Sequence, residues 1–118
     1  MDRALADQLR ELGQRGILIT AAQQGIITEL RCTMPECLCP QGPEHFEKKT
    51  HPPTDWAPSV DHYPRLKKDG GQLVLGNVRL AHILCNRVDY AKNHGKKHAR
   101  DRAKAVVTYY SIHRGKNP

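Results

Sequence analysis

The sequence predicts one small α+β domain, in which a short β-hairpin and the helix that follows it are flanked by helices at both ends. The chain has 118 residues, which leaves room for a single core. Apolar residues recur at helical spacing near both ends, and a strand-like segment in the middle is followed by the turn-forming pair Gly70-Gly71. Four cysteines and seven histidines are enough for a structural metal site, which often braces so small a core.

The composition indicates a cytoplasmic protein that is not bound to a membrane. No apolar run approaches the roughly 20 residues of a membrane span. The start of the chain, Met1-Asp2-Arg3-Ala4, lacks the apolar core of a secretory signal. Because cysteines seldom pair as disulfides in a reducing compartment, metal binding is the favoured role for the four cysteines.

The positive charge of the chain is concentrated at its C-terminal end. The formal net charge is +7, and the residues from Arg87 onward carry an excess of seven positive charges by themselves. A basic block of this kind suits a polyanion, because each phosphate that is neutralised releases a condensed counterion. The alternative is a solvated helix face that only aids solubility.

Residues 1–30 are expected to form a helical N-terminal extension. Asp2 can cap a first helix, and the apolar positions of this helix have helical spacing: Leu5, Leu9 and Leu12. Gly13 and Gly16 then end it. The segment from Ile17 to Leu30 mixes β-branched residues with alanine and glutamine, which leaves a strand pair and a second helix as alternatives.

Residues 31–93 are expected to hold the core of the domain. Seven of the eight prolines lie between Cys32 and Pro64, so this part is predicted to be a long irregular excursion, with residues 40–57 as its most mobile part. Residues 59–63 and 72–75 are predicted to pair as a β-hairpin across Gly70-Gly71.

A helix is predicted to follow the hairpin. Asn77 would be its N-cap, and apolar residues follow at helical spacing: Leu80, Leu84, and Val88 or Ala91. A stop is predicted at Asn93-His94-Gly95. Residues 94–118 are then expected to form one more helix, which is basic and ends near Gly115. The apolar stripe of this last helix comprises Ala99, Ala103, Val106, Val107 and Tyr110.

Four polar residues in the core have the chemistry that phosphodiester hydrolysis requires. The reaction needs a base to activate water, a group that orients the base, and a cation that neutralises developing charge. His62 titrates near neutral pH and can serve as the base. Asn77 can accept a hydrogen bond from its other ring nitrogen, and Asp61 and Asn86 offer oxygen ligands for a metal.

The order of these residues resembles the HNH nucleases, which have the ββα-metal (His-Me finger) fold. The matching text is Val60-Asp61-His62-Tyr63-Pro64, then Gly70-Gly71, then Asn77-Val78-Arg79-Leu80-Ala81-His82-Ile83-Leu84-Cys85-Asn86. It resembles the Asp-His, Gly-Gly, Asn-Leu-x-Leu and Cys-Asn order of the family and covers roughly residues 30–93. The chain departs from the family at Asn86, where the family name implies His, and at Tyr90 and Lys92, which shift a downstream lysine pattern.

The resemblance implies an endonuclease that leaves 5′-phosphate and 3′-hydroxyl ends. His62 would be the general base and Asn77 its orienting partner, while Asp61 and Asn86 would bind one divalent cation. Mg²⁺ or Mn²⁺ fits a site made of oxygens. Small free-standing proteins of this family are frequent in bacteriophages, which implies a phage or prophage origin and the cytoplasm of the host cell.

The resemblance also implies a structural zinc site. Zinc-stapled HNH proteins have one ligand pair before the hairpin and a second pair on the helix, which here gives Cys32 with Cys37 and His82 with Cys85. Three thiolates and one imidazole suit tetrahedral zinc. Two alternatives remain open. Cys39 could replace Cys37 as a ligand, or the cysteines and His82 could simply be buried.

The expected partner is DNA, bound mainly through its backbone by a monomer or weak dimer. The basic residues expected to contact it are Arg79, Arg87, Lys92, Lys96, Lys97 and Arg100. Two other functions fit the same residues: a non-catalytic, zinc-dependent DNA-binding module, and an RNA-cleaving nuclease of the same fold.

Overall fold

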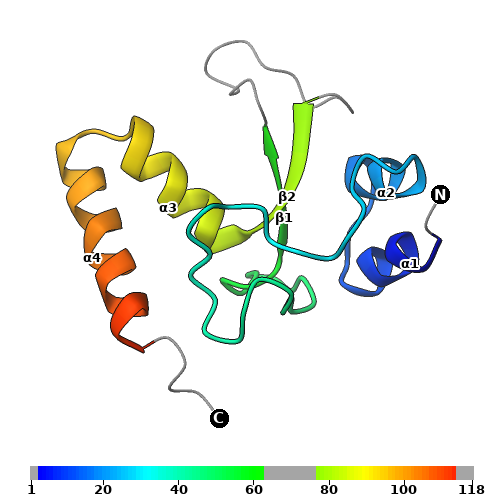
Figure 1. The fold of residues 1–118 in the computed structure, drawn as a ribbon, viewed down its shortest axis with the longest axis horizontal. Coiled ribbons are helices and arrows are strands. Elements are labelled where there is room, and N and C mark those ends of the chain that lie inside the picture. Colours follow the sequence, from blue (N-terminus) through cyan, green and yellow to red (C-terminus); the bar gives the residue numbers. More distant parts are fainter. Residues whose placement is uncertain (1–2, 63–76, 114–118) are drawn as a thin grey trace.

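The computed structural model describes residues 3–62 and 77–113. The described residues form four helices and one two-stranded antiparallel sheet (Figure 1). In chain order the elements are α1 (Arg3–Glu11), α2 (Ile17–Gln23), β1 (Pro58–His62), β2 (Val78–His82), α3 (Ile83–His94) and α4 (Lys97–His113). The predicted α+β class is confirmed. None of these helices is long and apolar enough to cross a membrane.

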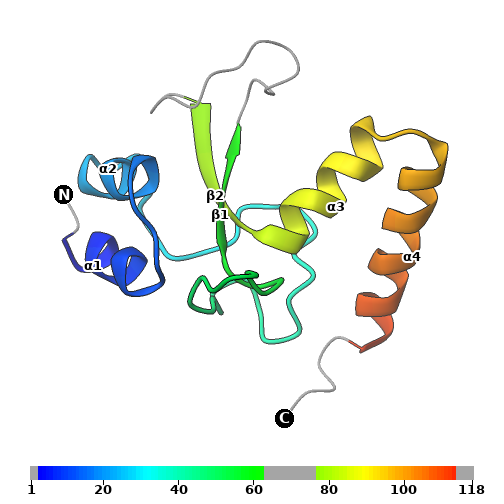
Figure 2. The same ribbon diagram turned by 180° about the vertical axis from the view of Figure 1, so that it is seen from behind.

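The two strands stand in the middle of the molecule, with the helices on either side. From the front and from behind, α1 and α2 lie on one side of the strands and α3 and α4 on the other (Figures 1 and 2). The irregular segment that joins α2 to β1 runs across the lower part of the sheet between these two groups. Backbone hydrogen bonds connect it to β2 at Leu80, to the start of α3 at Leu84 and to the end of the α1 region at Leu12.

The partner of β1 is a strand where the sequence predicted the start of a helix. β2 occupies Val78–His82, and α3 begins only at Ile83, so Asn77 precedes a strand and the prediction that it caps the helix was wrong. The physical reason is burial. Val78, Leu80 and His82 are all buried, at the period of two that a strand requires. The predicted strand at residues 72–75 and the turn at residues 70–71 lie outside the described residues.

The register of the sheet sets the positions of the predicted site residues on the strands. Asp61 is paired with Arg79, and His62 is paired with Val78. Residues 59 and 61 therefore share one face of the two-stranded ribbon, because side chains two apart on a strand point the same way.

The first two helices form a pair that packs on the strands. Leu5 and Leu9 of α1 are buried, and α2 buries Leu18 and Ala21, which settles the open choice between helix and strands for residues 17–23. The turn between them uses Gly13 and Gly16, with φ of 89° and 83°, a conformation that favours glycine. From the same turn, the buried Gln14 side chain donates to the Pro58 carbonyl of β1 at 3.2 Å.

The irregular segment is held along much of its length by backbone hydrogen bonds. Its connections include Cys32 N–H to Pro43 O (2.8 Å), Thr33 N–H to Leu80 O (3.0 Å), Glu47 N–H to Trp56 O (3.1 Å) and Lys49 N–H to Leu12 O (2.9 Å). Residues 40–57, expected to be the most mobile part, are thus tied to the helices and to their own neighbours. Bonds of this kind satisfy the polar groups that a chain without regular structure would otherwise bury.

α3 and α4 form an antiparallel pair on the side of the strands opposite α1 and α2 (Figure 1). The predicted stop is confirmed, since α3 ends at His94 and Gly95 N–H donates to Ala91 O at 2.9 Å. A Cβ at Gly95 would lie 2.5 Å from that same carbonyl, so the close turn requires glycine. The apolar stripe of α4 packs inward as predicted, with Ala103 buried and Tyr110 partly buried against the core.

Candidate metal centre and catalytic cluster

Four buried side chains converge at the point where the irregular segment meets β2 and α3. Cys32 and Cys37 come from the irregular segment, His82 is the last residue of β2, and Cys85 lies in the first turn of α3. One ligand atom from each residue lies within 4.8 Å of all the others. The predicted set of Cys32, Cys37, His82 and Cys85 is therefore positioned for a metal ion.

The spacing of the ligand atoms fits a tetrahedral ion. His82 Nδ1 lies 3.5 Å from Cys37 Sγ and 3.6 Å from Cys85 Sγ, and the two sulfurs are 4.0 Å apart. Tetrahedral bonds of about 2.3 Å to sulfur and about 2.0 Å to nitrogen separate the ligand atoms by roughly 3.5 to 3.8 Å. The Cys32 sulfur completes the set within 4.8 Å of the other three ligand atoms, and three sulfurs with one imidazole are consistent with structural zinc.

Neighbouring groups orient the ligands for this role. His82 Nε2 bonds to the backbone carbonyl of His45, and because a carbonyl only accepts, Nε2 has the proton and Nδ1 is left with a free lone pair. Backbone N–H groups point at two of the sulfurs: Leu38 N–H at Cys85 Sγ (3.3 Å) and His82 N–H at Cys32 Sγ (3.5 Å). Such donors favour thiolates over thiols.

Aromatic rings enclose the imidazole. The ring of Phe46 stacks on His82 with a centroid separation of 4.3 Å, and Trp56 meets it edge-on at 5.5 Å. His82 has no exposed surface. The ring is therefore fixed in place by packing on two sides as well as by its hydrogen bond to His45.

Ionisation of the thiols in the cluster is linked to metal binding. Hydrogen bonding to the neighbouring thiols of Cys32 and Cys37, together with burial, raises the pKa of Cys85 above the usual range of a thiol. Several thiolates so close together repel one another strongly. A divalent cation removes this cost, because a coordinated thiol loses its proton.

Cys39 stands apart from the cluster. Its Sγ contacts Gln41 Oε1 at 3.5 Å, and burial raises the pKa of its thiol. The geometry thus favours Cys37 over Cys39 as the ligand.

His82 and Cys85 were predicted to lie as a pair on one helix, and this prediction was wrong. His82 is the last residue of β2, and only Cys85 lies within α3.

The same strand–strand–helix unit contains the residues of the predicted catalytic cluster. Asn86, in the first turn of α3, donates from Nδ2 to Ser59 Oγ at 3.3 Å. Ser59 shares its face of the ribbon with Asp61, so the carboxylate and the Asn86 amide belong to one side of the sheet. Asn77 and Asn86 were predicted to lie on one helix. Asn77 instead directly precedes β2, and Asn86 lies on α3.

Asn77 and His62 are neighbours through the sheet register. Asn77 is buried and directly precedes Val78, whose strand partner is His62. His62 is the last residue of β1. Its side chain lies outside the described part of the structure.

Arg79 contacts Asp61 across the sheet. Its Nε donates to Asp61 Oδ2 at 2.7 Å, and its Nη2 lies 3.5 Å from the Met34 sulfur. The two side chains are 21% and 13% exposed. Arg79, predicted to contact DNA, therefore also neutralises the predicted metal ligand Asp61.

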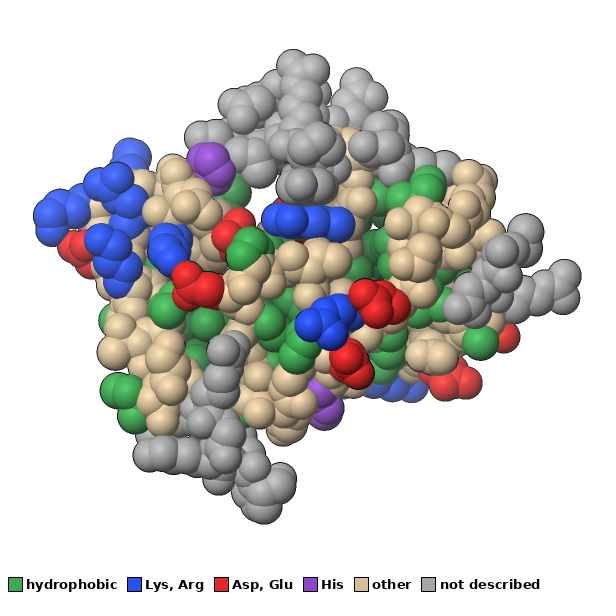
Figure 3. Space-filling model, in the orientation of Figure 1, with side chains coloured by type: hydrophobic (Ala, Val, Ile, Leu, Met, Phe, Trp, Pro, Cys, Tyr) green, Lys and Arg blue, Asp and Glu red, His purple; other side chains and the backbone are tan. Residues whose placement is uncertain are grey.

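The other predicted nucleic-acid contacts lie on α3, on α4 and at the turn between them. Arg87, Lys96, Lys97 and Arg100 are exposed. Lys97 pairs with Asp101 at 2.8 Å, and Lys92 pairs with Glu36 at 2.9 Å. Figure 3 shows lysine and arginine side chains gathered over this end of the molecule. We call Lys96, Lys97 and Arg100 the α4 basic patch.

Comparison with known proteins does not assign the chain. No family model, curated protein or solved structure matches it.

Several residues that shape the site were not found from the sequence. Phe46 and the carbonyl of His45 support His82, yet they lie 36 and 37 residues away from it in the chain. A backbone carbonyl has no sequence signature. The isolated Phe46, the chain's only phenylalanine, was the one available signal.

Proposed function

We propose that the chain is a metal-dependent endonuclease of the HNH type that hydrolyses DNA. The observation that supports this most is the unit β1–β2–α3, clamped at one end by the Cys32, Cys37, His82 and Cys85 cluster. The same unit sets Asp61 and Asn86 on one side of its two strands. The order of strand, strand and helix is the order that a ββα-metal site requires.

The residues of the chain have distinct roles in this proposal. His62 takes a proton from the attacking water, and Asn77 holds the imidazole in the orientation for that step. Asp61 and Asn86 bind a divalent cation, either Mg²⁺ or Mn²⁺, through oxygen. When bound, the cation stabilises the negative charge that develops on the phosphate and on the leaving 3′-oxygen.

The Cys3His cluster has a structural role. It joins the irregular segment to β2 and α3, and a metal in a site of this kind contributes folding free energy directly. Its four positions are all filled by protein side chains, which is typical of a structural rather than a catalytic zinc site.

The α4 basic patch would hold the nucleic acid through its phosphates. Its residues are exposed; Lys96 lies in the turn that follows α3, and Lys97 and Arg100 lie at the start of α4. Contacts of this kind position a duplex without reading its sequence. The proposed substrate is therefore DNA that is bound with little base specificity. The same groups could cleave RNA, and a comparison of DNA and RNA substrates would reveal this alternative.

One observation favours a second candidate function. Asp61 is engaged by Arg79 at 2.7 Å, so a cation at Asp61 has to share the carboxylate with a guanidinium. If Arg79 holds the carboxylate permanently, the chain would be a zinc-dependent DNA-binding module without catalysis.

A nicking assay separates the two functions. Purified protein is incubated with supercoiled plasmid and Mg²⁺ or Mn²⁺, next to His62→Ala and to His51→Ala, an exposed histidine of the irregular segment. We expect nicking by the wild type and by His51→Ala, and a loss of at least about a hundredfold in His62→Ala, since a general base contributes about that much or more. DNA binding without nicking by any of the three proteins would support the binding module and overturn the nuclease.

A further inference from the structure

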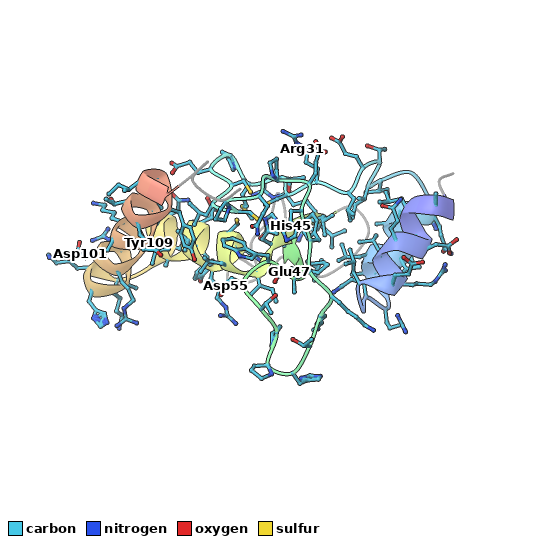
Figure 4. The ribbon with its side chains drawn as sticks, turned by 90° about the horizontal axis from the view of Figure 1, so that it is seen from below. Arg31, His45, Glu47, Asp55, Asp101 and Tyr109 are labelled. Atoms are coloured by element: carbon cyan, nitrogen blue, oxygen red, sulfur yellow. The ribbon has the colours of Figure 1, made fainter. Side chains whose placement is uncertain are left out.

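A hollow lies between α4, the start of α3 and the loop before β1. Its volume is about 420 Å³, and it is lined by Asp55, by Leu84 and by one face of α4 that includes Arg102, Val106 and Tyr109. Figure 4 labels Tyr109 on α4 and Asp55 on the neighbouring loop. None of these residues belongs to the metal centre or to the proposed catalytic cluster.

Aromatic rings form the apolar wall of this hollow. Tyr109 is 55% exposed, an unusually open position for a large ring, and the ring of Tyr110 meets it edge-on at 5.0 Å. Leu84 adds an aliphatic surface at the start of α3. Exposed aromatic faces of this kind are the platforms on which proteins stack unpaired bases.

The aromatic wall is held in place because its rings pack, through Trp56, against the candidate metal centre. Tyr110 meets Trp56 edge-on at 5.4 Å, and Trp56 in turn meets the ligand His82 at 5.5 Å. The loop on the other side is fixed as well, since Leu84 N–H donates to the Asp55 carbonyl at 3.0 Å. A platform that is already ordered loses little entropy when a ligand binds.

The charges around the hollow complement a nucleotide. Arg102 lies at its edge and donates to His98 Nε2 at 3.0 Å, so its guanidinium is oriented along α4. The carboxylate of Asp55 is exposed and can accept from the amino group of a base. The α4 basic patch lies at the start of the same helix and in the turn before it, and would attract phosphates to this end of the molecule.

We propose that this hollow binds one unstacked base of a single-stranded nucleic acid, with the ring on Tyr109 and the adjoining phosphate on Arg102. The inference rests on the proposed function and sharpens it, because it predicts a preference for unpaired or frayed strands over intact duplex. An aromatic side chain of a partner protein would use the same wall but would not need Arg102.

The test measures binding without cleavage. A dye-labelled single strand of twelve deoxyadenosines, and a duplex of the same length, are titrated with protein in the absence of Mg²⁺ while anisotropy is recorded. Tyr109→Ala and Arg102→Ala are compared with Tyr90→Ala, a matched control on α3 whose ring is 44% exposed. Trp56 is the chain's one tryptophan and lies against Tyr110, so quenching of its fluorescence reports occupancy of the hollow.

We expect tighter binding of the single strand than of the duplex, with quenching of Trp56. Tyr109→Ala should weaken single-strand binding by about tenfold or more, the usual effect of removing one stacking ring, and Tyr90→Ala should leave it unchanged. Equal loss in Tyr109→Ala and Tyr90→Ala, or duplex binding without single-strand binding, would overturn the pocket and leave the nuclease proposal standing. Binding of neither nucleic acid would overturn both.

Discussion

Cys37 Sγ and His82 Nδ1 lie 3.5 Å apart although 45 residues separate them in the chain. Their contact joins the irregular segment to the end of β2, where α3 begins. Since β1, β2 with the residue that precedes it, and α3 provide the residues of the proposed catalytic cluster, the geometry of that cluster depends on this contact. The metal centre is therefore expected to control both stability and activity.

Removing one ligand should release the metal and unfold the domain. Structural zinc sites contribute about 10 to 16 kcal/mol in small peptides, which is at least as large as the total stability of about 5 to 15 kcal/mol that is usual for a native protein. We expect Cys85→Ser to contain less than half an equivalent of zinc and to lose its cooperative thermal transition. Metal analysis and circular dichroism measure the two effects.

Cys39→Ser is the matched control, because Cys39 is also buried but lies outside the cluster. It should retain one equivalent of zinc. If Cys39→Ser loses the metal while Cys37→Ser retains it, Cys39 is the ligand and the assignment of Cys37 is wrong.

Acidification should weaken the irregular segment through Glu47. Hydrogen bonds from Thr54 and from His45, whose Nε2 is 3.2 Å from the carboxylate, lower the pKa of Glu47 below its ordinary value of 4.5. A lowered folded-state pKa stabilises the fold above the unfolded pKa, and this contribution is lost as the pH falls through the folded value. The advantage of the wild type over Glu47→Gln in thermal midpoint should thus be full at pH 6 and shrink below about pH 4.5. A gap that stays constant from pH 6 to pH 3 would show that the carboxylate contributes nothing.

The candidate metal-binding residues could be predicted from the sequence because the resemblance implies two ligand pairs and coordination chemistry restricts the residue types. Few residue types bind zinc, and the chain has two pairs of them, Cys32 with Cys37 and His82 with Cys85, on either side of the predicted hairpin. The helices near the ends were predictable for a similar reason, since the stripe of α4 and the Leu5–Leu9 spacing of α1 fit a single period.

The start of α3 was not predictable in the same way. Leu80 and Leu84 are four residues apart and fit a helix, yet Leu80 lies in the middle of β2 and Leu84 lies in α3. The pairing with residues 58–62 decided the outcome, and a local spacing does not contain that information. The support of His82 by Phe46 and His45 depends on the path of the irregular segment, which has no period at all.

The pair of Asp61 and Arg79 should contribute modestly to stability. The two side chains are only partly buried, so their coupling is expected to be about 1 kcal/mol. A double-mutant cycle with Asp61→Asn, Arg79→Gln and the combined variant in urea unfolding measures it. Independent, additive losses would mean that the 2.7 Å contact is energetically neutral.

The α4 basic patch should set the salt dependence of DNA binding. Each lysine or arginine that contacts a phosphate adds about one to the slope of log affinity against log salt. Lys96→Ala and Arg100→Ala should each lower that slope by about one. Lys48→Ala, an exposed lysine of the irregular segment, should leave it unchanged; a uniform effect of all three would indicate attraction by net charge rather than by a defined surface.

The most direct test of the proposed nuclease is the chemistry of the ends that it leaves. Zinc-loaded protein is incubated with an end-labelled DNA duplex, with and without added Mg²⁺ or Mn²⁺, and the products are treated with a phosphatase, a ligase and a 3′-exonuclease that needs a free hydroxyl. The proposal for His62, Asn77, Asp61 and Asn86 predicts cleavage only with the added cation, giving 5′-phosphate and 3′-hydroxyl ends that ligate directly. Cleavage that leaves 3′-phosphate ends, or no cleavage with either cation, would contradict it.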